Sequence, residues 1–189
     1  MKKNFITVLL ILFAILLGSY AYIEYNQPLN KSVLRLHVVA NSDSPADQAL
    51  KLAVKDHIVT QMSEEFRSVD SAQEARRIAI SKKAEIKQEA ESLVTSRGYD
   101  YPVEVYVGQF DFPTKNYGNL VFPQGRYEAV RVVLGEGEGK NWWCVLFPPL
   151  CMVSSSDKGL SLDSPAEAQV SLKCLELLPQ GVKVKLSGK

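Results

Sequence analysis

The segment at residues 141–151 constrains the fold of this chain more than any other. It holds both tryptophans of the chain, two of its three cysteines and a double proline. Because neighbouring residues of a strand point to opposite faces, Trp142 and Trp143 cannot both enter one core from a one-sided sheet. Pro148 and Pro149 have no amide hydrogen and end any ladder. We therefore expect a strand that leads into a rigid, aromatic corner.

Length and charge limit the classes of function. The chain has 189 residues, with 22 basic and 21 acidic side chains and a net charge of +1. This length suits one modest core. The balanced charge lacks the basic excess of nucleic-acid-binding proteins, so we expect no nucleic-acid partner. We expect no metal or cofactor either, because neither histidine lies near the cysteines and no Cys-x-x-Cys pair occurs.

The first residues predict export. Two lysines precede an apolar run at residues 5–17, and the small residues Ser19 and Ala21 follow. This layout is typical of a signal peptide that is cleaved after Ala21. The apolar stretch extends to Ile23, close to the roughly 20 residues that span a bilayer, so an uncleaved membrane anchor is the alternative. Residues 1–22 are thus a signal peptide or a membrane anchor, and both place the rest of the chain outside the cytoplasm.

Hydrophobic periodicity predicts the elements that follow a spacer at residues 23–32. Alternation of apolar and polar residues predicts strands at residues 34–40, 103–107 and 130–134 and from Trp142 onward. Apolar residues at helical spacing predict a helix from a cap at Ser44 to about Phe66. A second helical stretch follows a cap at Ser71, with a bend near Ser81 and a stop at Gly98.

This order of elements predicts an α+β fold, with helices packed on one face of a mixed or antiparallel sheet after an N-terminal hydrophobic export segment. We assign residues 33–153 to the domain and residues 154–189 to a C-terminal extension. Within the extension, a short helix is expected at residues 165–178.

Two further segments are interpreted as loops. Residues 135–140 are rich in glycine but lack the spacing of a phosphate-binding loop, and they are expected to form a tight hairpin turn into the Trp142 strand. Residues 110–113 and 122–123 contain phenylalanine and proline. We expect them to lie outside regular strands and to rim an exposed aromatic patch.

The cysteines allow two interpretations. Outside the cytoplasm a disulfide persists, and the proline corner is able to bring Cys144 and Cys151 together. Both residues are equally compatible with buried, reduced thiols. Cys174 is left over in either case.

A histidine near carboxylates raises the question of catalysis. His37 lies on the polar face of the first strand and could act as a general base with Asp43, or with Cys144 as nucleophile, in an extracytoplasmic hydrolase. Histidine and aspartate after a strand more often hydrogen-bond a turn and cap a helix. We therefore expect no catalytic residues and keep the hydrolase as the alternative.

Three segments carry a family resemblance. Residues 34–44, residues 117–129 (which contain Tyr-Gly-Asn and Gly-Arg-Tyr-Glu-Ala) and residues 141–151 resemble stage II sporulation protein R of endospore-forming bacteria. The resemblance covers residues 33–153. It implies a protein that is made in the forespore and crosses its inner membrane into the space between the forespore and mother-cell membranes. There it signals a membrane-embedded aspartic protease to process and activate a mother-cell sigma factor.

The chemistry of the residues, rather than the resemblance, selects the candidates for partner binding. They are polar or aromatic residues near the first strand and the aromatic corner: His37, Asn41, Asp43, Tyr117, Trp142, Trp143 and Phe147.

Overall fold

The computed structural model describes residues 2–25, 28–117 and 120–150, and within the first range the side chains of residues 6–20. The strands are β1 (Leu34–Val39), β2 (Val103–Phe112), β3 (Lys115–Tyr117), β4 (Leu120–Phe122), β5 (Gly125–Leu134) and β6 (Asn141–Phe147). The helices are α1 (Lys2–Tyr25), η1 (Leu29–Lys31), α2 (Pro45–Glu65), α3 (Ala72–Ser81) and α4 (Lys83–Ser96). The short helix expected at residues 165–178 lies outside the described residues.

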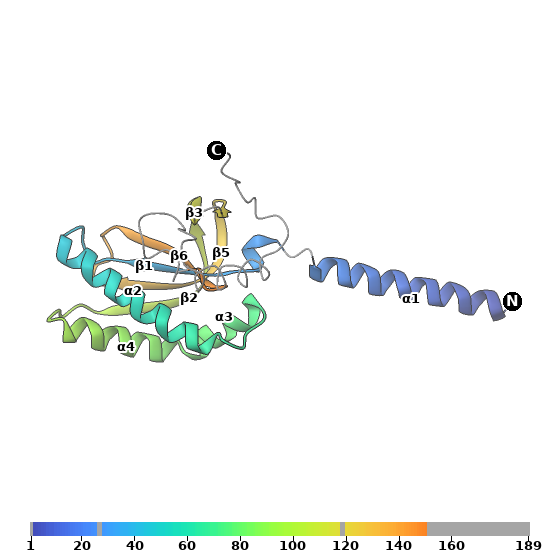
Figure 1. Cartoon of the computed structure of the whole chain (residues 1–189), viewed down its shortest axis with the longest axis horizontal. Helices are drawn as coiled ribbons and strands as arrows, with labels where there is room; N and C mark the ends of the chain where they lie inside the picture. Colours follow the sequence, from blue (N-terminus) through green and yellow to red (C-terminus); the bar gives the residue numbers. More distant parts are fainter. Residues whose placement is uncertain (1, 26–27, 118–119, 151–189) are drawn as a thin grey trace, which may run out of the picture.

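The main sheet has four strands in the order β2-β5-β1-β6, and β3 and β4 form a separate two-stranded hairpin (Figure 1). β1 pairs parallel to β5 and antiparallel to β6, and β2 pairs antiparallel to β5. The sheet is therefore mixed. Helices α2, α3 and α4 pack on one face and share a buried core with Leu34, Leu36 and Val38 of β1. The predicted α+β fold is confirmed.

Local sequence explains where the helices begin and end. The hydroxyl of Ser44 accepts a hydrogen bond from the Asp47 amide at 3.1 Å at the start of α2, and Ser71 caps α3 in the same way. The predicted bend separates α3 from α4 at Lys82. Gly98 follows α4 with a φ of 82°, a conformation that glycine adopts without strain.

The glycine-rich loop at residues 135–140 is not the expected hairpin turn. β1 lies between β5 and β6, so the loop crosses the end of β1 instead of joining neighbouring strands. The Gly139 amide donates to the Ala40 carbonyl at 2.9 Å. A Cβ on Gly139 would lie 2.2 Å from the Ser42 carbonyl oxygen. The loop is rich in glycine because two backbone segments meet here without room for a side chain.

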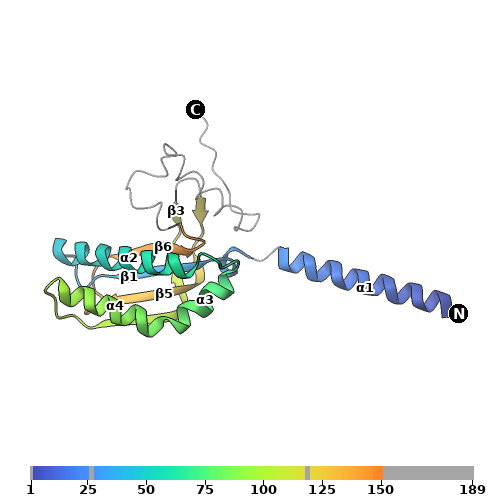
Figure 2. The same ribbon diagram turned by 60° about the horizontal axis from the view of Figure 1, so that its bottom comes forward.

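The expectation of an exposed patch at residues 110–113 and 122–123 is also wrong in part. Phe112 ends β2 and Phe122 ends β4, and both rings are buried. The reason is the β3–β4 hairpin, which is inserted between β2 and β5 and folds back over the sheet (Figure 2). These rings therefore form a second core on the face of the sheet opposite the helices.

Helix α1 carries a band of exposed apolar side chains. The large apolar residues between positions 6 and 17 have exposed fractions of 52–66%. Figure 1 shows the helix apart from the sheet. Among the residues that the structure describes, no helix is both long and apolar enough to cross a membrane.

Candidate functional site on the open face of the sheet

The candidate site is the face of the main sheet that the helices leave uncovered, which we call the back face. Alternation along β1 directs Arg35 and His37 to this face. The strand register sets His37 beside Arg131 of β5 on one side and Trp143 of β6 on the other. The β3–β4 hairpin covers the end of the back face at Arg35. At the other end Phe110, Arg131 and Trp143 stay partly exposed.

Arg35 is fully buried beneath the hairpin. Its Nη2 donates a hydrogen bond to the Tyr117 hydroxyl at 2.9 Å, and that hydroxyl donates to the Trp143 carbonyl at 3.1 Å. The guanidinium lies 4.1 Å from the ring centroid of Phe112 and 4.8 Å from that of Tyr127. Nε and Nη1 have no hydrogen-bond partner. Burial lowers the pKa of Arg35 below its ordinary value, while Tyr117 opposes the shift.

No described carboxylate pairs with Arg35, so the aromatic rings and one phenol are what stabilise its charge. Burial likewise raises the pKa of the Tyr117 hydroxyl, against the effect of the Arg35 charge. Both groups therefore stay in their ordinary protonation states near neutral pH. The pair fastens the hairpin to the sheet.

His37 supports the tryptophan beside it. The imidazole stacks on the Trp143 indole with ring centroids 3.8 Å apart and an interplanar angle of 15°. Its Nε2 lies 2.6 Å from the Asn141 Oδ1, and its Nδ1 is buried without a partner. Burial lowers the pKa of His37 from 6.5 to about 4, in spite of the Asn141 hydrogen bond. The ring is therefore neutral at pH 7 and acts as a flat platform for Trp143.

Asn41 and Asp43 fasten the glycine-rich loop. Asn41 Oδ1 accepts a hydrogen bond from the Glu136 amide at 3.0 Å, and Asp43 Oδ1 accepts one from the Lys140 amide at 2.7 Å. Asn41 also donates to the buried carboxylate of Asp47 at 3.0 Å. These contacts explain both residues structurally. The Asp43 side chain is still 56% exposed, so a partner contact there stays a prediction.

The two tryptophans take opposite faces, as expected from their adjacent positions. Trp142 pairs with Val38 on the helix side and packs against the main core. The Nζ of Lys55 in α2 lies 5.0 Å from the centroid of the Trp142 ring. Trp142 is therefore separated from Trp143 by the thickness of the sheet, and the two cannot serve one contact surface.

Phe147 is a core residue in this structure. Its ring is 2% exposed and packs edge to face against Phe66, with centroids 5.9 Å apart. We had expected it to contact a partner, but no surface of the ring is available for one. The chain turns directly after it, as predicted, and the Leu150 amide donates to the Val145 carbonyl at 3.2 Å.

The cysteine question is settled for one of the three residues. Cys144 is buried and disulfide-bonded. Cys151, the predicted partner, lies outside the described residues, as does Cys174. The pairing of Cys144 with Cys151 therefore stays a prediction.

The residues of the hydrolase alternative do not assemble. Cys144 pairs with Leu36 on the helix side of the sheet, while His37 faces the back face. A disulfide-bonded sulfur is also no thiolate nucleophile. The hydrogen bonds of His37 and Asp43 go to Asn141 and Lys140. Within the described residues there is also no cluster of three or more side chains suited to holding a metal ion.

Analysis of the sequence missed Arg35, Arg131 and Phe110 as members of the site. The alternation in β1 and β5 placed both arginines on a face away from the helices. That face was taken to be solvated. The available signal was the number of aromatic residues at positions 110–127, which are enough to cover a second face.

The fold and the back face together define an α+β domain with a recognition surface of aromatic and arginine side chains. The chain belongs to the stage II sporulation protein R family, whose model matches residues 30–157. It is 35% identical to Stage II sporulation protein R of Bacillus subtilis (strain 168) over 195 aligned positions, which cover 98% of this chain and 86% of that protein. No solved structure matches the chain.

Proposed function

We propose that this protein is an exported signal of sporulation. It acts between the forespore and mother-cell membranes, where it triggers a membrane-embedded aspartic protease to process and activate a sigma factor precursor. Membership of the stage II sporulation protein R family supports the role in sporulation. The band of exposed apolar side chains in α1 supports export, because a signal peptide or an anchor needs such a band.

The observation that supports the contact surface is the open end of the back face. Trp143, Phe110 and Arg131 are partly exposed there, and they belong to residue types that dominate binding energy at protein interfaces. Arg131 lies 5.7 Å from the Phe110 ring centroid, and its Nε has no hydrogen-bond partner. The stacked His37 ring holds Trp143 in place before any partner arrives, which lowers the entropic cost of binding.

As a mechanism, the back face binds an extracytoplasmic surface of the protease in its active or dimeric state. A ligand shifts such an equilibrium only as far as its affinity for the two states differs. Moving the protease from 1% to 99% active requires a preference of about 10⁴-fold. A rigid surface is suited to this, because it has one shape to match against the two states.

The experiment is a charge reversal on one strand, with sigma factor processing as the readout in sporulating cells. Arg131→Glu places a carboxylate on the back face. Arg126→Glu is the matched control, since Arg126 lies on the same strand but points to the opposite face and its side chain is 67% exposed. We expect Arg131→Glu to reduce processing at least about tenfold and Arg126→Glu to leave it unchanged.

Both variants must reach the normal level outside the forespore and unfold at a similar temperature. Normal processing by Arg131→Glu under these conditions would exclude the back face as the contact surface. Equal loss in both variants would point to a general effect of charge.

A further inference from the structure

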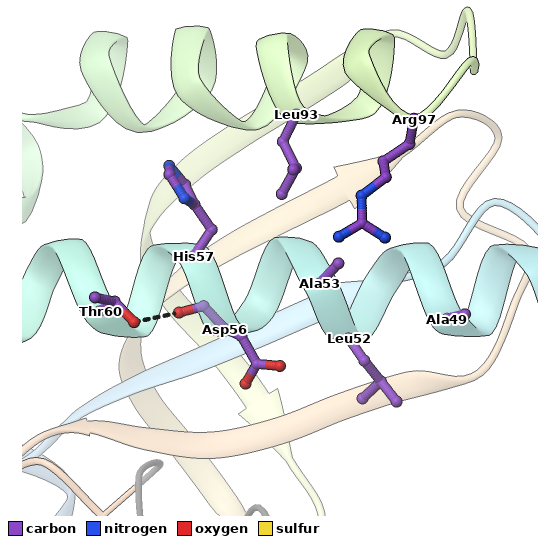
Figure 3. A pocket seen from close by; sticks show the side chains of 8 residues that line it. All are labelled: Ala49, Leu52, Ala53, Asp56, His57, Thr60, Leu93 and Arg97. Carbon is purple, nitrogen blue, oxygen red and sulfur yellow. Dashed lines mark hydrogen bonds between the residues drawn. The ribbon is translucent and has the colours of Figure 1, made fainter.

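A groove runs between α2 and α4 on the side of the domain opposite the back face. It has two adjoining parts of about 590 and 540 Å³, and both are lined by His57 and Leu93. Figure 3 shows the larger part, with Leu93 and Arg97 pointing from α4 toward α2 and His57 pointing from α2 toward α4. We call this feature the α2–α4 groove.

The groove is long and regular because α2 and α4 are antiparallel. Gln61 hydrogen-bonds Glu85 at 3.1 Å, and His57 contacts Glu89 at 2.8 Å. Ala49 and Arg97 line the far end. From residue 49 to residue 61 the groove extends for about 18 Å at 1.5 Å per residue, or roughly three turns of an additional helix.

Small and apolar side chains form the larger part of the groove. Ala49 and Ala53 let an incoming chain approach the backbone of α2, and Leu93 forms the wall from α4. Leu52 stands at the rim and is 39% exposed. Such a surface is suited to apolar side chains that repeat every three or four residues along a helix.

One charge in the groove is unmatched. The carboxylates at the other end are engaged within the chain, because Glu89 contacts His57 and Glu85 contacts Lys82 at 2.9 Å. Arg97 has neither a hydrogen bond nor an ion pair through its guanidinium within the described part of the chain. An occupant therefore has to supply a negative charge at the Arg97 end and requires none at the other.

We propose that the α2–α4 groove binds an amphipathic helix of a partner protein, with its apolar side chains along Ala49, Ala53 and Leu93 and a carboxylate opposite Arg97. The groove and the back face lie on opposite sides of the sheet. The domain is therefore able to hold this helix while its back face is occupied, and the inference does not depend on the proposed contact with the protease.

The test uses two synthetic helical peptides as probes for the full-length protein. Each is roughly 18 residues long, enough to form a helix, with leucines at i, i+3, i+4 and i+7. One carries a glutamate at the end that meets Arg97, and the other carries a lysine there. We expect the glutamate peptide to bind saturably, as followed by fluorescence anisotropy, and the lysine peptide to bind more weakly.

Charge reversal provides the specific readout. Arg97→Glu should lower the affinity for the glutamate peptide roughly three- to tenfold and should reverse the preference between the two peptides. Arg77→Glu on α3 is the control, because its side chain is 77% exposed and lies outside the groove. It should change neither affinity. Equal binding of the two peptides, or an equal effect of both variants, would contradict the proposal.

A second pair of variants tests the apolar contact. Leu52→Asp changes the rim of the groove, whereas Ile80→Asp changes an apolar residue on α3 that is 45% exposed. Only Leu52→Asp should weaken the glutamate peptide. A photoreactive residue at position 52 in sporulating cells should crosslink to another protein. Crosslinking to this chain alone, or no saturable binding of either peptide, would overturn the proposal.

Discussion

The hydrogen bond between Tyr117 and Arg35 allows a quantitative prediction about the buried cation. Tyr117→Phe removes the hydroxyl but keeps the ring. The hydroxyl makes two bonds, one from Arg35 Nη2 at 2.9 Å and one to the Trp143 carbonyl at 3.1 Å. A hydrogen bond to a charged group contributes about 1.5–3 kcal/mol, and a neutral one about 0.5–1.5 kcal/mol. We therefore expect Tyr117→Phe to lower the free energy of unfolding by about 2–4 kcal/mol.

The same arithmetic predicts coupling between the two residues. In an Arg35→Met background the cation is gone, so Tyr117→Phe should cost only about 0.5–1.5 kcal/mol for the Trp143 bond. The coupling energy should be about 1.5–3 kcal/mol. Arg35→Met alone should be close to neutral or stabilising, because Nε and Nη1 are buried without partners.

The assay is urea unfolding of the four proteins of this double-mutant cycle, followed by tryptophan fluorescence and circular dichroism. Trp143 makes the fluorescence sensitive to the back face, because its carbonyl accepts the Tyr117 bond. A coupling energy below about 0.5 kcal/mol, with unchanged slopes, would refute the reasoning that the phenol stabilises the charge.

Three further predictions concern the loop, the histidine and the disulfide. Gly139→Ala should destabilise the protein by about 1–3 kcal/mol in thermal unfolding, because its Cβ meets backbone at 2.2 Å, whereas a Cβ on Gly108 meets nothing within 4 Å and Gly108→Ala should cost less; equal costs would contradict this. Since burial lowers the pKa of His37 to about 4, the unfolded state binds the proton first, so the free energy of unfolding should be highest above pH 6.5 and fall by about 3 kcal/mol toward pH 4. His37→Gln should flatten that slope, and an unchanged slope would assign it to other groups. Peptide mapping without reduction should link Cys144 to Cys151, and a link to the remaining cysteine would show that the predicted pairing is wrong.

The sequence predicted the parts of the fold that local rules determine. Ser44 and Ser71 begin helices because their hydroxyls satisfy amides of the first turn, and this depends on neighbouring residues only. The alternation in β1 likewise assigned Leu36 to the core. The class of fold follows from such elements and their order.

Strand order was beyond these rules. β1 inserts between β5 and β6, so its pairing with β5 joins residues that lie about 95 positions apart, such as Arg35 and Ala129. Nothing local distinguishes that arrangement from a β5–β6 hairpin. For this reason the loop at residues 135–140 was interpreted as a turn, although its glycines make room for the segment after β1.

The candidate site was predicted in part. His37 and Trp143 do meet on one face, but Phe147 and Trp142 belong to the other side of the sheet. Polar residues on alternate positions were taken to indicate a solvated face. Arg35 is instead buried, because the β3–β4 hairpin covers it, and contacts between a hairpin and a distant strand depend on tertiary structure.

The central claim is that the protein acts outside the cytoplasm through its back face, and a photocrosslink tests it most directly. A photoreactive residue replaces Trp143 in sporulating cells, and the same residue at position 80 on α3 serves as the control. The account predicts that position 143 captures the membrane-embedded protease and that position 80 does not. Capture from position 80 alone, or a fully active protein retained in the cytoplasm of the forespore, would contradict it.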